Sequence, residues 1–473
     1  MAALTASRQT AKPSPWLLML PLGITLALLP PAAVFPIVLA TAGTAVLLAR
    51  PRWALYLLAL TVPYQGLFDF KYQDVSISIT EAVVVLLLVG WLTLVLNRRA
   101  RPATASPLLG AIAGLLVCFA LTVFIAPNIN LAAKEMLKWI ELAAVFLAGT
   151  CLIEAPAHRR TLLIWLLGAG ASQALVGLVQ SVLRQGPEHF MIGGLIMRAY
   201  GTFEQPNPFG GYLGLTVPLA VSLAVFGLQP GLARRLVIVV ALITALALAL
   251  TLSRGAWTAQ LVALALVLAV SNTRARQALG AGVVFVVILL AALWPLIPSE
   301  VTERLTSVVV SAVDLGSVKE AVVTPDNWAV LERLSQWYAG WEMFLDNPIL
   351  GVGIGNYNAA YETYRLEQWP VALGHAHNHY LTIAAEAGFV GFLAYVFFWV
   401  VVFRACAHAL RRAPGRIERA VVVGILSSLA AFATHNLFDV LFVHGMGVTL
   451  GLLLTLLHGA PHGLADRPAS AGS

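Results

Sequence analysis

The chain has 473 residues, of which 59% are hydrophobic and only 11% are charged. Soluble domains usually carry about 25% charged residues, so this composition excludes a soluble enzyme, a disordered chain and a DNA-binding domain. The formal net charge of +7 then indicates basic cytoplasmic loops of a membrane protein, and no nucleic-acid partner is expected. Apolar residues come in blocks of about 20 without alternation, which excludes an outer-membrane barrel.

These blocks predict an all-α polytopic membrane protein with about 12–14 transmembrane helices and one large helical external loop. The first run follows Arg8 and Lys12, and we interpret it as a membrane helix because apolar segments simply continue after it. Pro30 and Pro31 separate the first two runs, which also fit a re-entrant hairpin. The runs are 16–31, 32–49, 53–68, 79–96, 107–126, 137–153, 161–183, 209–227, 234–252, 255–271, 277–297, 379–403, 419–436 and 439–458.

Most of the 29 Lys and Arg residues fall in short loops on one side of these spans. Such asymmetry places both termini in the cytoplasm. The chain then divides into an N-terminal bundle, a short external loop, central helices, a large external loop, and C-terminal helices with a cytoplasmic tail. The boundaries of these five parts are 1–183, 184–208, 209–297, 298–378 and 379–473.

The large loop has helical patterning of its own. Apolar side chains recur at steps of three and four through Trp328–Asp346, which predicts a helix that Pro348 and the following glycines end. We expect a second helix over 356–369 and a third amphipathic stretch over 301–312. The glycine run 351–355 lacks the strand before it and the Lys-Ser/Thr after it that a nucleotide loop needs, so it predicts a flexible turn.

Three histidines in five residues, His375, His377 and His379, end the large loop where the next span begins. Imidazole suits proton transfer near neutral pH, so one of these groups could act as a base toward a hydroxyl outside the membrane. His375 and His379 also have the spacing of metal ligands on a helix. No HExxH pattern or adjacent acidic residue accompanies them, and we expect no metal and no cofactor.

Ionisable residues beside membrane spans are costly and therefore indicate function. Arg254 lies in a very short external turn and Arg198 just before a span, and the guanidinium fork fits the oxygens of a diphosphate whose lipid tail stays in the bilayer. Headgroup anchoring is the alternative for each arginine. Arg333, on the predicted loop helix, could guide an anion or a sugar. Glu386 lies within a span and could pair with Arg254.

Several motifs, in this order, resemble the O-antigen ligase/polymerase superfamily. They are TFEQPN at 202–207, SRGA at 253–256, WEMFLDNPILGVGIGNY at 341–357, GHAHNHYL at 374–381 and EAGFVG at 386–391. The resemblance covers roughly residues 195–400, and outside them the match is one of hydropathy alone.

This resemblance implies a GT-C-like, metal-independent membrane glycosyltransferase, O-antigen ligase-like, in the bacterial inner membrane with its site at the periplasmic face. The glycan donor would be linked to undecaprenyl diphosphate, and the acceptor would be a sugar hydroxyl of lipid A-core. By position, His377 matches the family's base, and Arg198 and Arg254 match the arginines that hold the diphosphate. His375, Arg333, Asn378 and Glu386 complete the expected substrate contacts.

Two alternatives remain open from the sequence. A polymerase of the same fold would join lipid-linked repeat units, and the motifs do not separate it from a ligase. A transporter or flippase for lipid-linked sugars would explain the span count, but it predicts internal symmetry and ionisable residues near the bilayer midplane. The expected polar residues cluster at one face instead, which favours an enzyme.

Overall fold

The computed structural model describes residues 31–67, 69–72, 75–99, 106–270, 273, 276–277, 280–281, 318–319, 322–324 and 327–459. Fourteen α-helices are found in these residues. They are α2 (Pro31–Ala49), α3 (Arg52–Tyr64), α4 (Ile79–Leu96), α5 (Pro107–Val123), α6 (Ile129–Leu152), α7 (Pro156–Leu183), α8 (Pro206–Ser222), α9 (Leu232–Leu250), α10 (Arg254–Val270), α13 (Trp328–Asp346), α14 (Tyr357–Tyr364), α15 (His379–Arg412), α16 (Arg416–His435) and α17 (Met446–Gly459).

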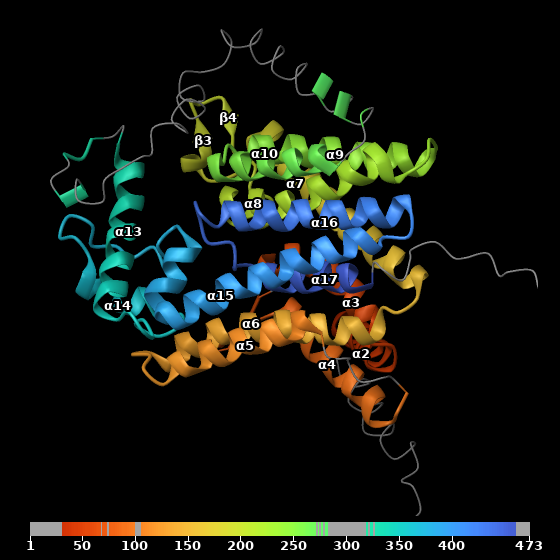
Figure 1. Ribbon diagram of the computed structural model, residues 1–473, viewed down its shortest axis with the longest axis horizontal. Helices are drawn as coiled ribbons and strands as arrows, with labels where there is room; N and C mark the ends of the chain where they lie inside the picture. The colour runs from red at the N-terminus through yellow and green to blue at the C-terminus, as the bar shows by residue number, and fades with distance from the viewer. Residues whose placement is uncertain are drawn as a thin grey trace, which may run out of the picture.

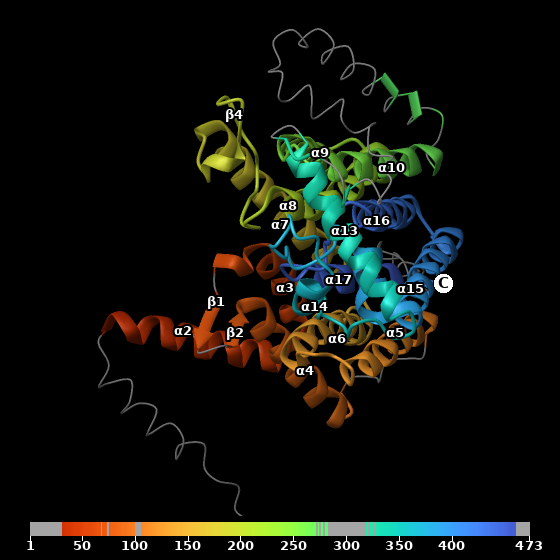
Figure 2. The same ribbon diagram turned by 90° about the vertical axis from the view of Figure 1, so that its left-hand side faces the viewer.

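Two short antiparallel hairpins accompany the helices. Strand β1 (Asp69–Tyr72) pairs with β2 (Val75–Ser78), and β3 (Met191–Ile192) pairs with β4 (Ile196–Met197). Short turns of other helix types lie at Gln65–Leu67, Glu188–Phe190 and Leu223–Gly227. The long helices lie side by side, while α13, α14 and the β3–β4 hairpin gather at one end of the bundle (Figure 1). We call this the loop end; α13 runs obliquely across it (Figure 2).

The predicted class, an all-α polytopic membrane protein, is confirmed for the described part of the chain. Six helices there are long and apolar enough to cross a membrane: α4, α7, α8 with the turn after it, α9, α15 and α16. In the apolar segment of α8 that could cross the membrane, 83% is buried inside the protein, against 22% in α9. Helix α8 therefore lies at the centre of the bundle, whereas α9 turns most of its apolar surface outward, as a lipid-facing helix does.

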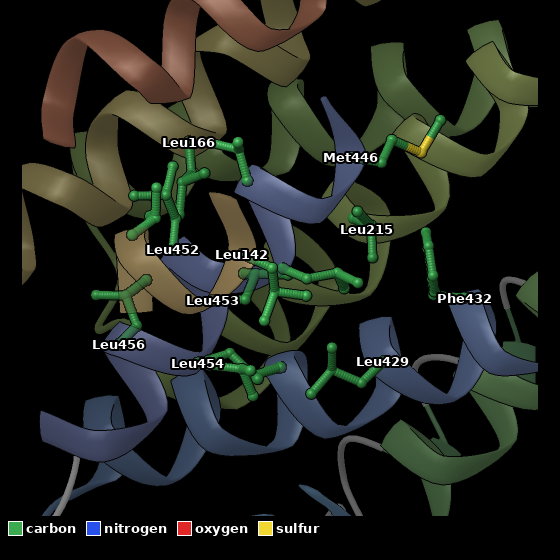
Figure 3. Close-up of a cluster of buried hydrophobic side chains, with 14 of the residues drawn as sticks. Leu142, Leu166, Leu215, Leu429, Phe432, Met446, Leu452, Leu453, Leu454 and Leu456 are labelled. Atoms are coloured by element: carbon green, nitrogen blue, oxygen red, sulfur yellow. The ribbon is translucent and has the colours of Figure 1, made fainter. Parts of the chain in front are cut away.

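The core forms where α8 and α17 meet their neighbours. Helix α16 packs against α8 and α10, and α17 packs against α6. Leu142 of α6, Leu166 of α7, Leu215 of α8, Leu429 of α16 and Leu453 of α17 belong to the cluster drawn in Figure 3. The side chains labelled there are apolar, so close packing of side chains holds this part of the bundle together.

Helix α15 is broken at Gly388, whose backbone has φ 59° and ψ −162°. The break frees backbone groups that pair with the segment after α13. The N–H groups of Val352 and Gly353 donate to the carbonyls of Ala385 and Glu386, and Phe389 N–H donates to Pro348 O. Backbone hydrogen bonds therefore hold the glycine run against α15. The expectation of a flexible turn there is wrong.

Element boundaries differ from expectation in the large loop and at the start of the last helix. Helix α13 has the predicted bounds, but α14 ends at Tyr364 because Arg365 is extended, and the chain then folds back so that the Tyr361 hydroxyl reaches Trp369 O. Helix α17 begins at Met446, not near 439. The expected run 16–31 and the stretch 301–312 lie outside the described residues, as does most of 277–297.

Candidate functional site

The histidine segment is fixed by the start of α15. Asn378 is the N-cap of this helix, and its side-chain oxygen accepts a hydrogen bond from Leu381 N–H. His379 N–H donates to Asn436 O at 2.8 Å, which ties the segment to the end of α16. His377 adopts a left-handed backbone, with φ 49°. These restraints hold the His377 side chain toward the loop between α16 and α17, residues 436–445.

A continuous chain of polar side chains runs from His377 to Arg198. His377 Nδ1 lies 3.2 Å from Asp439 Oδ1, and the other carboxylate oxygen of Asp439 accepts from Asn207 Nδ2 at 2.8 Å. Asn207 Oδ1 in turn accepts from Arg198 Nη2 at 3.2 Å. The structure thus brings together an imidazole and a guanidinium from segments that are distant in sequence.

Arg198 is further anchored to the turn that begins α10. Its Nε donates to Thr251 O at 2.8 Å, and Ala199 N–H donates to Leu250 O at 2.9 Å. Two of the five guanidinium N–H groups are thus used by Thr251 and Asn207.

Arg254 is the first residue of α10 and follows this same turn. The next residue, Gly255, lies against the end of α16: a Cβ there would be 2.7 Å from a ring carbon of His435. The close approach needs glycine, and it places the start of α10 beside the turn that carries Asp439. Arg254 is half-buried at this junction.

Asp439 is the electrostatic centre of the site. Burial by itself raises the pKa of this carboxyl group, but the hydrogen bond from His377 and the charges of His377, His375 and His435 outweigh it, so the pKa lies below the ordinary value. Asp439 therefore stays ionised throughout the physiological range. An ionised carboxylate on Nδ1 fixes the orientation of the His377 ring.

His375 packs against His377 with their ring centroids 4.6 Å apart and the rings nearly perpendicular. Its Nδ1 accepts a hydrogen bond from the His377 backbone N–H at 3.0 Å. Burial lowers the pKa of His375 to about 4, and the charge of Arg333 on α13 acts in the same direction. His375 is therefore neutral at neutral pH, and Arg333 lies close enough to act on this part of the site.

Glu386 has a different task from the substrate contact or Arg254 pair that the sequence predicts. Its two oxygens accept hydrogen bonds from the backbone N–H groups of Gly355 and Tyr357, at 2.9 and 3.0 Å. The side chain is 4% exposed. Glu386 therefore anchors the glycine run to α15. Like the N-cap residue Asn378, it fixes the backbone around the site.

Metal ligation is geometrically open to one group in the described residues, His375, His377 and Asp439, whose ligand atoms lie within 4.8 Å of one another. By their spacing on a helix, His375 and His379 are the expected pair of ligands. His379 does not join this group, because its ring is buried against Trp139 and Phe442, with centroids 6.3 and 4.7 Å away.

Neither Asn207 nor Asp439 is among the site residues selected from the sequence. Both are short polar side chains next to the ends of apolar runs, and Asn207 is the last residue of the TFEQPN motif. Polar residues at span ends are common anchors, so position alone did not distinguish them. Their pairing depends on how α8 packs against the 436–445 loop, which a linear pattern does not contain.

Residues 237–396 match the protein family described as O-antigen ligase. The matched segment runs from within α9 to within α15 and includes Arg254, Arg333, His375, His377 and Glu386. Arg198, Asn207 and Asp439 lie outside it. No curated protein matches the chain. The resemblance carried by the motifs is thereby confirmed: the chain is a polytopic helical membrane protein whose residues 237–396 match the O-antigen ligase family.

Proposed function

We propose that this protein is a membrane glycosyltransferase that moves a glycan from undecaprenyl diphosphate to a sugar hydroxyl of lipid A-core. The observation that supports this most directly is the hydrogen-bonded chain from His377 through Asp439 and Asn207 to Arg198. It couples a group able to accept a proton to a group able to hold a diphosphate. The family match of the segment that contains His377 and Arg254 supports the same reaction class.

His377 would act as the base. When Nδ1–H donates to Asp439, the lone pair of Nε2 can take the proton of the acceptor hydroxyl. The acceptor oxygen then forms a bond to the anomeric carbon, and the bond from that carbon to the diphosphate oxygen breaks. The electron pair leaves with undecaprenyl diphosphate. One displacement of this kind inverts the anomeric configuration.

Arg198 and Arg254 would stabilise the leaving diphosphate. Charge builds on its oxygens as the glycosidic bond breaks, and guanidinium groups fixed beforehand in a water-poor setting stabilise that charge without reorganising. Arg198 is fixed in this sense, because Thr251 and Asn207 hold it. Two arginines supply the positive charge, so the mechanism has no step that requires a metal.

The site would lie at the periplasmic face of the bacterial inner membrane, with both termini in the cytoplasm. Lipid-linked glycans present their sugars on that side, and the β3–β4 hairpin, which Arg198 directly follows, lies at the loop end of the bundle (Figure 1). The partners in this proposal are the lipid-linked donor, the lipid A-core acceptor and the surrounding membrane lipids.

Purified protein in detergent, mixed with an undecaprenyl-diphosphate-linked glycan and lipid A-core, tests the proposal. We expect transfer without added metal, loss of transfer in His377→Ala, and retained binding of the glycan donor by that variant. A second lipid-linked repeat unit offered as acceptor separates a ligase from a polymerase. Unchanged transfer in His377→Ala would refute the assignment of the base, and movement of lipid-linked sugar across a vesicle membrane without any transfer would favour a flippase.

A further inference from the structure

A small polar cavity lies beside the end of the 436–445 loop, the loop that also carries Asp439. It is bounded by the ends of α3 and β2, the first turn of α4, the first half of α6 and residues 442–447. Its volume is about 90 Å³. The polar side chains that line it are Gln65, Ser78, Glu81, Lys138, Glu141 and His444.

Glu141 is the unusual member of this lining. It is 7% exposed, and its carboxylate makes no hydrogen bond within the part of the chain that the structure describes. The neighbouring groups are already engaged: Ser78 and Glu81 form a reciprocal cap at the start of α4, and Lys138 Nζ lies 2.5 Å from Glu135. A buried carboxylate without hydrogen bonds is costly, so an acceptor left over in a cavity indicates that a ligand supplies the donor.

The cavity and the site share one piece of backbone. Asp439 lies near the beginning of the 436–445 loop, and Phe442, His444 and Gly445 near its end line the cavity. Phe442 also stacks on His379, with centroids 4.7 Å apart. A ligand in the cavity would therefore contact the same loop that carries Asp439.

The chemistry of the lining restricts the class of ligand that the cavity can bind. Two carboxylates face one lysine that is already paired, so an anionic group such as phosphate is disfavoured. A lipid chain does not suit so polar and small a space. Hydroxyl groups both donate and accept, which matches a wall that offers carboxylate, amide, hydroxyl and ammonium groups. About 10–15 Å³ of this kind of volume holds one water molecule, so about 90 Å³ admits the hydroxyl-bearing edge of one sugar.

We propose that this cavity is a carbohydrate subsite in which Glu141 accepts hydrogen bonds from the hydroxyl groups of one sugar residue. The inference rests on the proposed glycosyl transfer and adds a specificity-determining position to it. The sugar belongs either to the glycan of the donor or to the acceptor. The hydrogen-bonding chemistry is the same for both, and kinetics distinguish them.

Steady-state transfer by Glu141→Gln and Glu141→Leu tests the subsite. A hydrogen bond to a charged group contributes about 1.5–3 kcal/mol, so we expect KM for one of the two substrates to rise by roughly tenfold or more. The kcat should stay close to that of the unaltered protein, because Glu141 touches no reacting atom. Titrating lipid-linked glycan at saturating lipid A-core, and then the reverse, shows which substrate supplies the sugar.

Glu141→Leu guards against a folding artefact, since it removes the buried charge together with the acceptor. Glu362→Gln is the matched control, because Glu362 is an exposed carboxylate paired with Arg365 on α14. Unchanged KM values for both substrates in Glu141→Gln and in Glu141→Leu would overturn the subsite, while the transferase proposal would stand.

If the unaltered protein transfers no glycan, the proposed function fails, and the subsite is then judged by binding alone. Delipidated core oligosaccharide and delipidated donor glycan are each added to the protein, and saturation-transfer NMR is recorded. A signal with the unaltered protein that Glu141→Leu loses would uphold the subsite. Equal signals from both proteins, or none from either, would overturn it.

Discussion

Asp439 holds His377 on one carboxylate oxygen and Asn207 on the other, at 3.2 and 2.8 Å. The carboxylate is thus shared between an imidazole in the loop before α15 and an amide at the start of α8. Because Asn207 also accepts from Arg198, any movement of Asp439 would disturb both ends of the site. Asp439 therefore orients the imidazole directly and, through Asn207, helps to place the guanidinium that Thr251 also holds.

Replacing Asp439 with Asn should lower kcat more than it changes KM for the lipid-linked glycan. The amide has similar size but carries no charge, so it neither fixes the productive tautomer of His377 nor stabilises the protonated ring. Positioned proton transfer typically contributes about 10²–10⁴-fold to the rate, and we expect a loss within that range. Asp346→Asn, at the exposed end of α13, is the control. Full activity of Asp439→Asn would argue against His377 as the base.

Replacing Arg198 with Lys should weaken binding of the lipid diphosphate although the charge is kept. Lysine lacks the planar fork that bonds Thr251 and Asn207 together, so its ammonium group would not be held in the position of the guanidinium. We expect roughly a 10–100-fold rise in Kd, since charge-assisted hydrogen bonds are lost. Binding of undecaprenyl diphosphate to detergent-purified protein measures this. Arg235→Lys, at the exposed start of α9, should leave Kd unchanged, and an unchanged Kd in Arg198→Lys would remove Arg198 from the diphosphate site.

Much of the fold could be read from the sequence because long apolar runs leave little choice in a membrane. The start of α5 at Pro107, for example, coincides with the predicted run. The late start of α17 could not be predicted this way, because residues 440–443 are apolar although they form a loop. The loop is held by hydrogen bonds to residues that are distant in the chain: Asp439 bonds to His377 and Asn207, and Asn436 O accepts from His379 N–H.

The site was predictable in part for a similar reason. His377 and Arg198 could be selected from residue type and position, because imidazole and guanidinium are rare and costly near a bilayer. Glu386 was selected on the same ground but serves the backbone of Gly355 and Tyr357. Its partners are main-chain N–H groups exposed by the sharp glycine turn, and no side-chain pattern reveals them.

Gly388→Ala should destabilise the protein. A Cβ there would lie 2.3 Å from the backbone carbon of Ile349, and the residue has a left-handed φ of 59°. Backbone strain and overpacking together should lower the free energy of unfolding by at least about 2 kcal/mol. Gly110→Ala on α5 is the matched control, because nothing lies within 4 Å of its added Cβ. A thermal melt in detergent should show a lower midpoint for Gly388→Ala only, and equal midpoints would contradict the interpretation of the α15 break.

Chelation should leave the transfer rate unchanged. The proposed mechanism assigns the stabilisation of charge to Arg198 and Arg254, so it contains no step that depends on a divalent cation. Transfer is measured before and after dialysis against EDTA, with a parallel sample to which magnesium is returned. A rate that falls on chelation and recovers with metal would instead assign His375, His377 and Asp439 as metal ligands.

His375 should make stability depend on pH in a defined window. Burial lowers the pKa of its folded form to about 4, whereas the unfolded chain has the ordinary value of 6.5. Above pH 6.5 both states are neutral and the full stability is present. As the pH falls from 6.5 toward 4, the unfolded state binds a proton that the folded state does not, so the free energy of unfolding decreases. Below about pH 4 both states are protonated, and this contribution no longer changes.

The matched variant for this prediction is His375→Asn, whose side-chain oxygen can still accept the hydrogen bond from the His377 backbone N–H. Thermal midpoints of the two proteins in detergent are compared between pH 7.5 and pH 4.5, and other titrating groups contribute to both curves alike. The midpoint of the unaltered protein should fall more steeply over this range than that of the variant. Parallel curves would show that His375 does not change its proton affinity on folding, and that the ring is less buried than its packing against His377 indicates.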